Sequence, residues 1–187
     1  MGVTEQFCGI LRNRSEENKK SFEVLFGNNL YGNCFSILRQ ELDSMVRVIY
    51  LLNIPEISKR ELLIKKTLNG EKWTFINHNN KVQNITDRDM VNIASELWGW
   101  TQNVYKFGCA FIHLSKFHNY LTEDPFMALS DTEKEDITNQ LNNYHFANLN
   151  QNSSLNDIIP YLPMVMEKIV ANFECNIRSL EINGHNN

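Results

Sequence analysis

The longest hydrophobic pattern in the chain begins after Thr86-Asp87-Arg88-Asp89, a sequence typical of a capping box at a helix start. Apolar side chains then recur at alternating spacings of three and four residues, as they do along one face of an α-helix. They are Met90, Ile93, Leu97, Trp100, Val104, Phe107, Phe111 and Leu114, followed by His118 and Leu121. The pattern predicts one long helix at the centre of the fold. Gly99 and Gly108 indicate either a close helix approach or a bend.

Two other apolar stripes predict long helices. One runs from Tyr31 to Leu52 and ends before Pro55, and the other begins near Pro163. Ser130 and Glu133 form a second capping box, which predicts a helix that fades near Asn143. A weaker helix is expected before residue 27. The stripe after Pro163 consists of Met166, Ile169, Phe173, Ile177 and Leu180.

The segments between these helices are polar or irregular. Within 69–85, two short segments (73–76 and 81–82) flank Asn77-His78-Asn79-Asn80, which is consistent with a small hairpin or an irregular insertion. Long loops are expected at 122–129 and 146–160. We therefore predict an all-α fold: an antiparallel bundle of four to five main helices in one domain, 1–187, with a disordered tail at 183–187.

Length and composition place the chain among ordinary globular proteins. Its 187 residues suit a single domain, and its net charge of -4 argues against a surface dedicated to a phosphate backbone. The densest basic stretch, 58–66, is expected to be a solvated helix. Neither a signal sequence nor an apolar segment of membrane-spanning length is present, so we expect a cytoplasmic protein that does not bind membranes. The four cysteines have no metal-site spacing and are expected to be small buried apolar residues: Cys8, Cys34, Cys109 and Cys175.

His118 is the polar residue that continues the apolar stripe, so it is either a hydrogen-bonded histidine near a helix end or a functional group. His113 lies about 140° around a regular helix from His118, which prevents the two from binding one metal ion. It is expected on a polar flank with Asn103 and Lys106. We predict no metal site, because the other candidate ligands come from separate loops: His78, His145, Glu123 and Asp124.

The stripe 31–52 also carries charged residues. Arg39, Asp43 and Arg47 are spaced for ion pairs on a helix surface. In the alternative interpretation, Arg39 or Glu41 points inward and pairs with the histidine-bearing helix, which would create a polar pocket with perturbed pKa values.

An early helix with Arg39-Gln40-Glu41-Leu42, followed by a long helix that ends in Phe111-Ile112-His113-Leu114-Ser115-Lys116-Phe117-His118, resembles the HEPN superfamily of prokaryotic helical bundles. The resemblance implies a four- or five-helix bundle, often dimeric, of the kind found among toxins, abortive-infection proteins and RNases of defence systems. Catalytic members carry an arginine four to six residues before a histidine. Here that arginine is missing before His113 and His118, and Lys106 is the nearest basic residue upstream of His113. The literal match is Arg178 with His185, in the polar tail.

If the chain is an enzyme, the resemblance implies a metal-independent ribonuclease. His118 or His113 would then be the general acid or base, and Arg39 or Lys106 would stabilise the transition state.

Three functions remain as hypotheses. The sequence favours a non-catalytic helical module, such as an antitoxin, defence-system subunit or scaffold, which binds another protein or a second copy of itself. The first alternative is a divergent HEPN-type RNase or toxin that acts on RNA as a dimer. The second is a bundle that binds a small molecule or metal in a cavity lined by Trp98, Trp100, Tyr105 and His118. We expect no cofactor, because the chain has no phosphate-binding or nucleophile motif.

Overall fold

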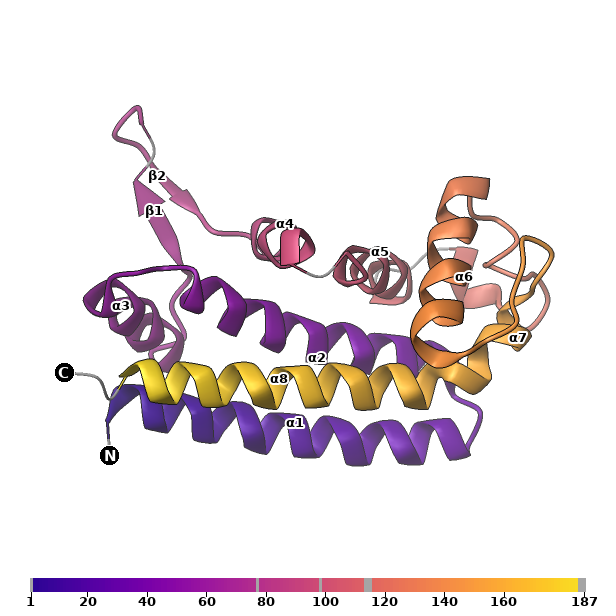
Figure 1. Cartoon of the computed structure of the whole chain (residues 1–187), viewed down its shortest axis with the longest axis horizontal. Helices are drawn as coiled ribbons and strands as arrows, with labels where there is room; N and C mark the ends of the chain where they lie inside the picture. The colour runs from indigo at the N-terminus through magenta and orange to yellow at the C-terminus, as the bar shows by residue number, and fades with distance from the viewer. Residues whose placement is uncertain (1, 77, 98, 113–115, 185–187) are drawn as a thin grey trace.

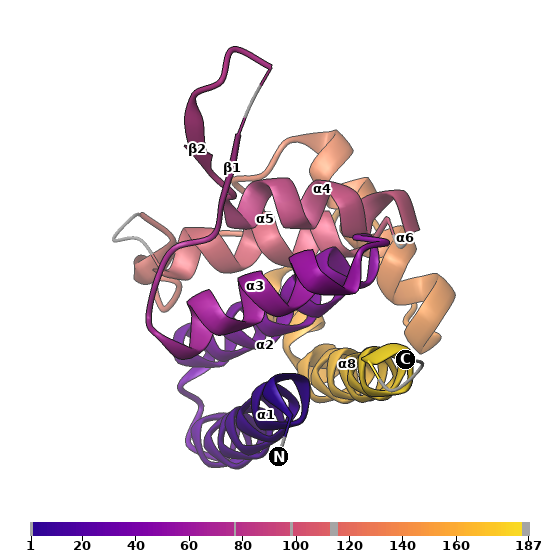
Figure 2. The same cartoon turned by 90° about the vertical axis from the view of Figure 1, so that its left-hand side faces the viewer.

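The computed structural model describes residues 2–76, 78–97, 99–112 and 116–184. Its three longest helices, α1 (Val3–Gly27), α2 (Tyr31–Leu52) and α8 (Leu162–Gly184), lie side by side (Figures 1 and 2). The short connection 28–30 makes α1 and α2 antiparallel, and α8 returns alongside them. α1 therefore begins at the same end of this layer at which α8 ends (Figure 1).

The other elements extend from α2 or cover it. A helix and a hairpin follow it: α3 (Ile57–Leu68), β1 (Thr74–Ile76) and β2 (Val82–Asn84). α4 (Asp87–Leu97) and α5 (Thr101–Ile112) then pack across α2. The chain continues through η1 (Lys116–Asn119), α6 (Asp131–His145), α7 (Leu155–Ile158) and η2 (Ile159–Tyr161), where η denotes a 3-10 helix. Helix makes up 73% of the chain, which confirms the all-α class. Over the described ranges, no helix combines the length and apolar character needed to cross a bilayer.

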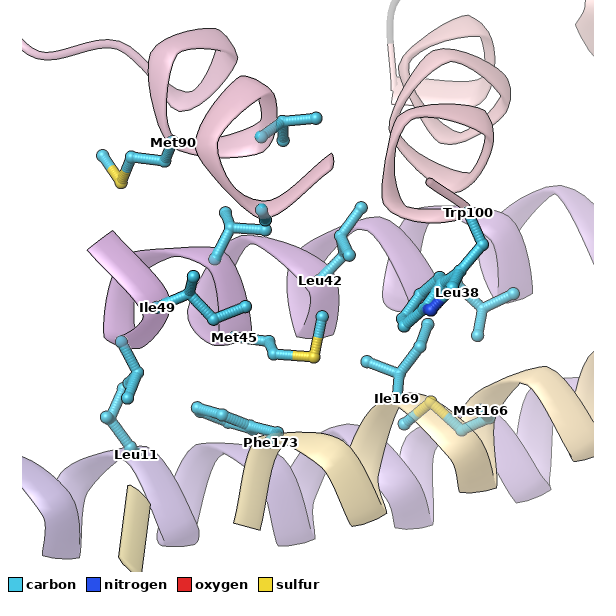
Figure 3. Close-up of a cluster of buried hydrophobic side chains, with 14 of the residues drawn as sticks. Leu11, Leu38, Leu42, Met45, Ile49, Met90, Trp100, Met166, Ile169 and Phe173 are labelled. Carbon is cyan, nitrogen blue, oxygen red and sulfur yellow. The ribbon is translucent and has the colours of Figure 1, made fainter. Parts of the chain in front are cut away.

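α2 is the central helix, because α1, α4, α5 and α8 all pack against it. Its apolar side chains are buried around most of its circumference, and Leu42 and Met45 are fully inaccessible. Figure 3 shows Met45 between α2 and α8, where it faces Phe173, with Ile169 nearby. Burial of large apolar side chains between these helices supplies the main stabilisation of the fold, at roughly 1.5–3 kcal/mol for each side chain.

The prediction of one long helix from Thr86 to Leu121 at the centre of the fold is wrong. α4 ends at Leu97, Gly99 and Trp100 lie in a turn, and α5 ends at Ile112. Gly99 is thus at a bend, which is one of the two alternatives for the glycines. The turn allows α4 and α5 to pack separately on α2, so that each buries its own apolar face.

Local signals located most helix starts and the hairpin correctly. The Thr86 and Ser130 capping boxes both form, with Asp89 N–H donating to Thr86 Oγ1 (3.3 Å) and Glu133 N–H to Ser130 Oγ (3.4 Å). α6 continues past Asn143 to His145. The basic segment 58–66 is helical within α3, and β1 and β2 form an antiparallel hairpin in which Ile76 pairs with Val82.

The two long loops contact each other through Asp124. Its Oδ1 accepts a hydrogen bond from Phe126 N–H (2.9 Å), and its Oδ2 accepts one from Leu155 N–H (2.9 Å). Asp124 therefore satisfies a backbone donor at the start of α7, which orders part of the segment that was predicted to be a loop.

Ser130→Ala should destabilise the protein by about 1 kcal/mol at neutral pH, because the Ser130 hydroxyl both accepts from Glu133 N–H and donates to Glu133 Oε2 (2.7 Å). The hydrogen bonds from Ser130 lower the pKa of Glu133 below its ordinary value of 4.5. A carboxylate with a lowered folded-state pKa stabilises the fold above that ordinary value and loses its contribution as the pH falls through the folded pKa. Urea unfolding should therefore show a smaller difference in the free energy of unfolding between parent and variant at pH 3 than at pH 7. An equal difference at the two pH values would contradict a contribution from the ionised Glu133 carboxylate.

Candidate functional site

Arg39 is buried between α2, α4 and α5, with 3% of its surface exposed. Its guanidinium forms an ion pair with Asp43 and lies 4.0 Å from the ring centroid of Tyr105 in α5. Arg39 Nη2 is also 3.8 Å from Asp87 Oδ2, at the start of α4. The predicted ion pair between Arg39 and Asp43 therefore forms, but the prediction that it lies on the helix surface is wrong. Arg39 points inward, toward the segment that was predicted to be the histidine-bearing helix.

Gly108 allows α5 to approach Arg39 closely. A Cβ atom at this position would lie 2.6 Å from Arg39 Cβ and 3.2 Å from its Cγ and Cδ. No real Cβ contact is that short, so only glycine fits without movement of the helices. This confirms the close-approach interpretation for Gly108, in contrast to the bend at Gly99.

Arg47 extends the same polar cluster toward the hairpin. Its Nη2 is 3.6 Å from Asp87 Oδ1, and its guanidinium lies 4.7 Å from the ring centroid of Trp73. Burial lowers the pKa of Arg47, and the nearby Asp87 carboxylate partly offsets that effect. Arg47 therefore pairs with α4 rather than with Asp43, because the tertiary packing brings Asp87 between the two guanidiniums. The two arginines, Arg39 and Arg47, and the two aspartates, Asp43 and Asp87, thus form a polar cluster with balanced charges. This cluster joins α2 to α4 and α5.

Glu41 is fully buried on another side of α2, facing α1. It accepts hydrogen bonds from Asn18 Nδ2 (2.8 Å) and from the Ser15 hydroxyl. The alternative in which Glu41 pairs with the histidine-bearing helix is therefore wrong. Its carboxylate instead satisfies two polar side chains of α1, as a buried acceptor must.

His118 lies in η1 and is exposed to solvent. Its Nε2 is 3.0 Å from the carbonyl oxygen of Phe111, in the last turn of α5, and its ring meets the Phe111 ring edge to face at 6.1 Å. A ring N–H in this position donates to a backbone carbonyl of the last helical turn, which is a common way to satisfy the carbonyls at a helix end. His118 is thus a histidine at a helix end, as one interpretation predicted, but it does not continue the apolar stripe of that helix.

The other predicted catalytic residues have different settings. Lys106 is exposed on α5, and its charge adds to the hydrogen bonds from Ser130 in lowering the pKa of Glu133 in α6. His113 lies outside the described residues, as does His185. Arg178 is in α8 and donates to Glu174 (2.9 Å). The described catalytic candidates therefore lie at three different places. Arg39 is buried beneath α5, Lys106 is exposed on α5, and His118 lies beyond the C-terminal end of α5.

A pocket with an apolar lining lies at the end of the molecule where α5, α6 and α8 meet. Trp100 lines it, as predicted for a ligand cavity, whereas Tyr105 and His118 do not, and Trp98 lies outside the described residues. Polar side chains also line this pocket. No sequence pattern indicated Gln140 or Lys168 as part of a site, and Asn103 and His145 were expected in other settings. Lys168 could have been noticed as a lone cation beside the apolar stripe of α8.

The candidate metal ligands and the cysteine thiols have different settings in the described part of the chain. That part holds no group of three or more His, Cys, Asp or Glu side chains arranged around a potential metal position. Cys8 and Cys34 are buried as predicted, and burial raises the pKa of their thiols to about 12 and about 11. Protonated thiols are poor nucleophiles. Cys175 is exposed, so the prediction of burial is wrong for that cysteine.

The hairpin β1–β2 carries several exposed apolar side chains on one short element. Phe75 is 44% exposed, and the cross-strand pair Ile76 and Val82 is 70% exposed at both positions. Its base is fixed, since Trp73 is buried and donates through Nε1 to Thr67 Oγ1 (2.8 Å). The chain matches no protein-family model, no curated protein and no solved structure.

Proposed function

We propose that this chain is a non-catalytic protein-binding module of the helical-bundle type, and that its hairpin β1–β2 is the binding element. The partner is another protein or a second copy of the chain. The observation that supports this proposal is an anchored hairpin that extends away from the helices (Figures 1 and 2) and exposes Phe75, Ile76 and Val82.

The hairpin combines a fixed base with an exposed outer part. Besides the Trp73 anchor, Lys66 Nζ donates to Thr74 Oγ1 (2.7 Å), and Ile85 N–H donates to the carbonyl oxygen of Trp73 (2.9 Å). A two-stranded hairpin is only marginally stable by itself, so the contacts of Trp73 and Thr74 to α3 are needed to hold it. An anchored element that keeps apolar side chains in water is suited to a partner that buries them.

The strands also offer backbone groups to a partner. The antiparallel pair Thr74–Ile76 and Val82–Asn84 has two outer edges, and an extended segment of another protein can add to such an edge through main-chain hydrogen bonds. Apolar side chains on the strands then contribute specificity. This mode of binding needs no catalytic group, in agreement with the structural contacts made by Arg39 and His118.

Replacing Ile76 and Val82 together by lysine should abolish partner binding while lowering the free energy of unfolding by no more than about 1 kcal/mol, because both side chains are largely exposed but the two lysines lie opposite each other. The matched control replaces Val24 and Leu121, which are 65% and 87% exposed elsewhere, by lysine. Sedimentation measures self-association, and affinity capture with quantitative mass spectrometry measures binding to other proteins. The proposal expects one interaction that the parent and control share and the hairpin variant lacks. Equal binding by all three would contradict it.

The ribonuclease alternative is tested on the same preparations. Total cellular RNA is incubated with the parent and with a variant carrying His113→Ala and His118→Ala, whose fold is checked by circular dichroism. The proposal expects no cleavage by either protein. Cleavage by the parent alone would overturn the non-catalytic assignment in favour of a HEPN-type ribonuclease.

A further inference from the structure

The pocket between α2, α5, α6 and α8 has the properties of a small-molecule site. Its walls are apolar and come from elements distant in sequence, including Phe35 and Leu38 of α2, Val104 of α5, Leu141 of α6 and Val165 of α8. The water-accessible volume is about 100 Å³. An apolar cavity of about 150 Å³ holds benzene in another protein, and this pocket has about two thirds of that volume, so a single ring would fill it and extend into its opening.

One buried acceptor in this pocket lacks a partner. Gln140 Oε1 is inaccessible to solvent and has no hydrogen-bond partner within the ranges that the structure describes. Gln140 lies one helical turn before Tyr144, and both side chains line the pocket. A buried acceptor without a hydrogen bond is destabilising, and a hydrogen bond from a ligand hydroxyl or N–H would offset that cost.

Lys168 is the charged group among the residues that line the pocket, and it is a cation. Lys168 Nζ lies 3.3 Å from the ring centroid of Tyr144, His145 is close by, and no Asp or Glu is among the lining residues. No carboxylate of the described residues forms an ion pair with Lys168. Burial lowers the pKa of Lys168. Burial also lowers the pKa of His145, and the nearby positive charge of Lys168 lowers it further. A partly buried cation without a counter-charge favours an anionic ligand.

We propose that this pocket binds a small aromatic carboxylic acid that carries a hydrogen-bond donor on its ring. The ring lies among the apolar side chains and the carboxylate lies beside Lys168. Because Gln140 Oε1 is inaccessible in the unliganded protein, the Gln140 side chain rotates on binding so that Oε1 accepts a hydrogen bond from the ring donor. This site is separate from the hairpin and independent of the proposed protein-binding function, because the hairpin extends from the α3 end of the molecule (Figure 1).

The test uses three probes that differ by one group each: 4-hydroxyphenylacetate, phenylacetate without the donor, and 4-methylphenol without the carboxylate. Titration of the full chain by calorimetry gives the three dissociation constants. We expect phenylacetate to bind about two- to tenfold more weakly than 4-hydroxyphenylacetate. We expect the dissociation constant of 4-methylphenol to exceed that of 4-hydroxyphenylacetate by a factor of about ten or more.

Two variants assign each preference to its residue. Lys168→Met should remove the preference for 4-hydroxyphenylacetate over 4-methylphenol, while the matched control Lys72→Met, on an exposed lysine, should keep it. Gln140→Leu should remove the preference for 4-hydroxyphenylacetate over phenylacetate. A structural role alone would weaken all three probes equally and leave the preferences intact.

A third variant fills the space. Val165→Phe should abolish binding of all three probes, and circular dichroism shows whether it folds. Absence of saturable binding to the parent would overturn the proposal, as would unchanged preferences in Lys168→Met and Gln140→Leu. Those two variants keep the proposal testable if Val165→Phe does not fold.

Discussion

Gly108→Ala is expected to destabilise the protein by about 1–3 kcal/mol, whereas Gly9→Ala is expected to stabilise it by up to about 1 kcal/mol. At Gly108 the added Cβ would lie 2.6 Å from Arg39 Cβ. Arg39 Cβ is next to the backbone of α2, so it cannot move aside as a side-chain end can, and α2 and α5 must separate. At Gly9, within α1, no atom lies within 4 Å of the added Cβ, and only the better helix propensity of alanine remains.

Chemical denaturation of the two variants beside the parent measures this difference. The same substitution in two helices should shift the unfolding midpoint in opposite directions at an unchanged slope. Stabilisation by Gly108→Ala would contradict the close approach of α5 to Arg39. Destabilisation by Gly9→Ala would contradict the open space that the structure shows beside Gly9 in α1.

The sequence predicted those parts of the fold that depend on neighbouring residues. α2 follows from a stripe with uninterrupted helical spacing, and α4 and α6 follow from capping boxes within four residues. A bend at Gly99 was one of two alternatives, but the separation into two helices was not predicted, because Leu97 and Trp100 keep a spacing of three across it. Apolar spacing by itself does not distinguish a straight helix from two helices that bury the same stripe.

The polar residues show the same limit. The spacing of Arg39 and Asp43 correctly predicted an ion pair, since both lie on one helix face. It did not predict burial, nor that Arg47 would pair with Asp87, because both depend on how α4 and α5 pack across α2. For the same reason the pocket polar groups were missed: Gln140 and Lys168 lie in different helices, and no local pattern connects them.

The proposed hairpin surface and the proposed ligand pocket have separate structural supports. The hairpin is anchored to α3 by Trp73, and Lys168 and Gln140 belong to α8 and α6. The lysine substitutions at Ile76 and Val82 should therefore leave probe binding unchanged, and Lys168→Met should leave partner binding unchanged. If one variant alters both kinds of binding, the two sites are coupled through the central helix α2.

Phe173→Ala should have the largest effect of any single substitution considered, a loss of about 3–5 kcal/mol in the free energy of unfolding. Phe173 is 1% exposed and its ring lies beside Met45 of α2 (Figure 3), so its removal leaves a cavity in the layer that α1, α2 and α8 share. Phe146→Ala is the matched control, since Phe146 is 92% exposed and should change stability by less than about 0.5 kcal/mol. Both are measured by urea unfolding. Similar losses for the two variants would contradict the placement of the core, whereas a loss at Phe173 alone would locate the main stabilising contacts between α2 and α8, away from the hairpin.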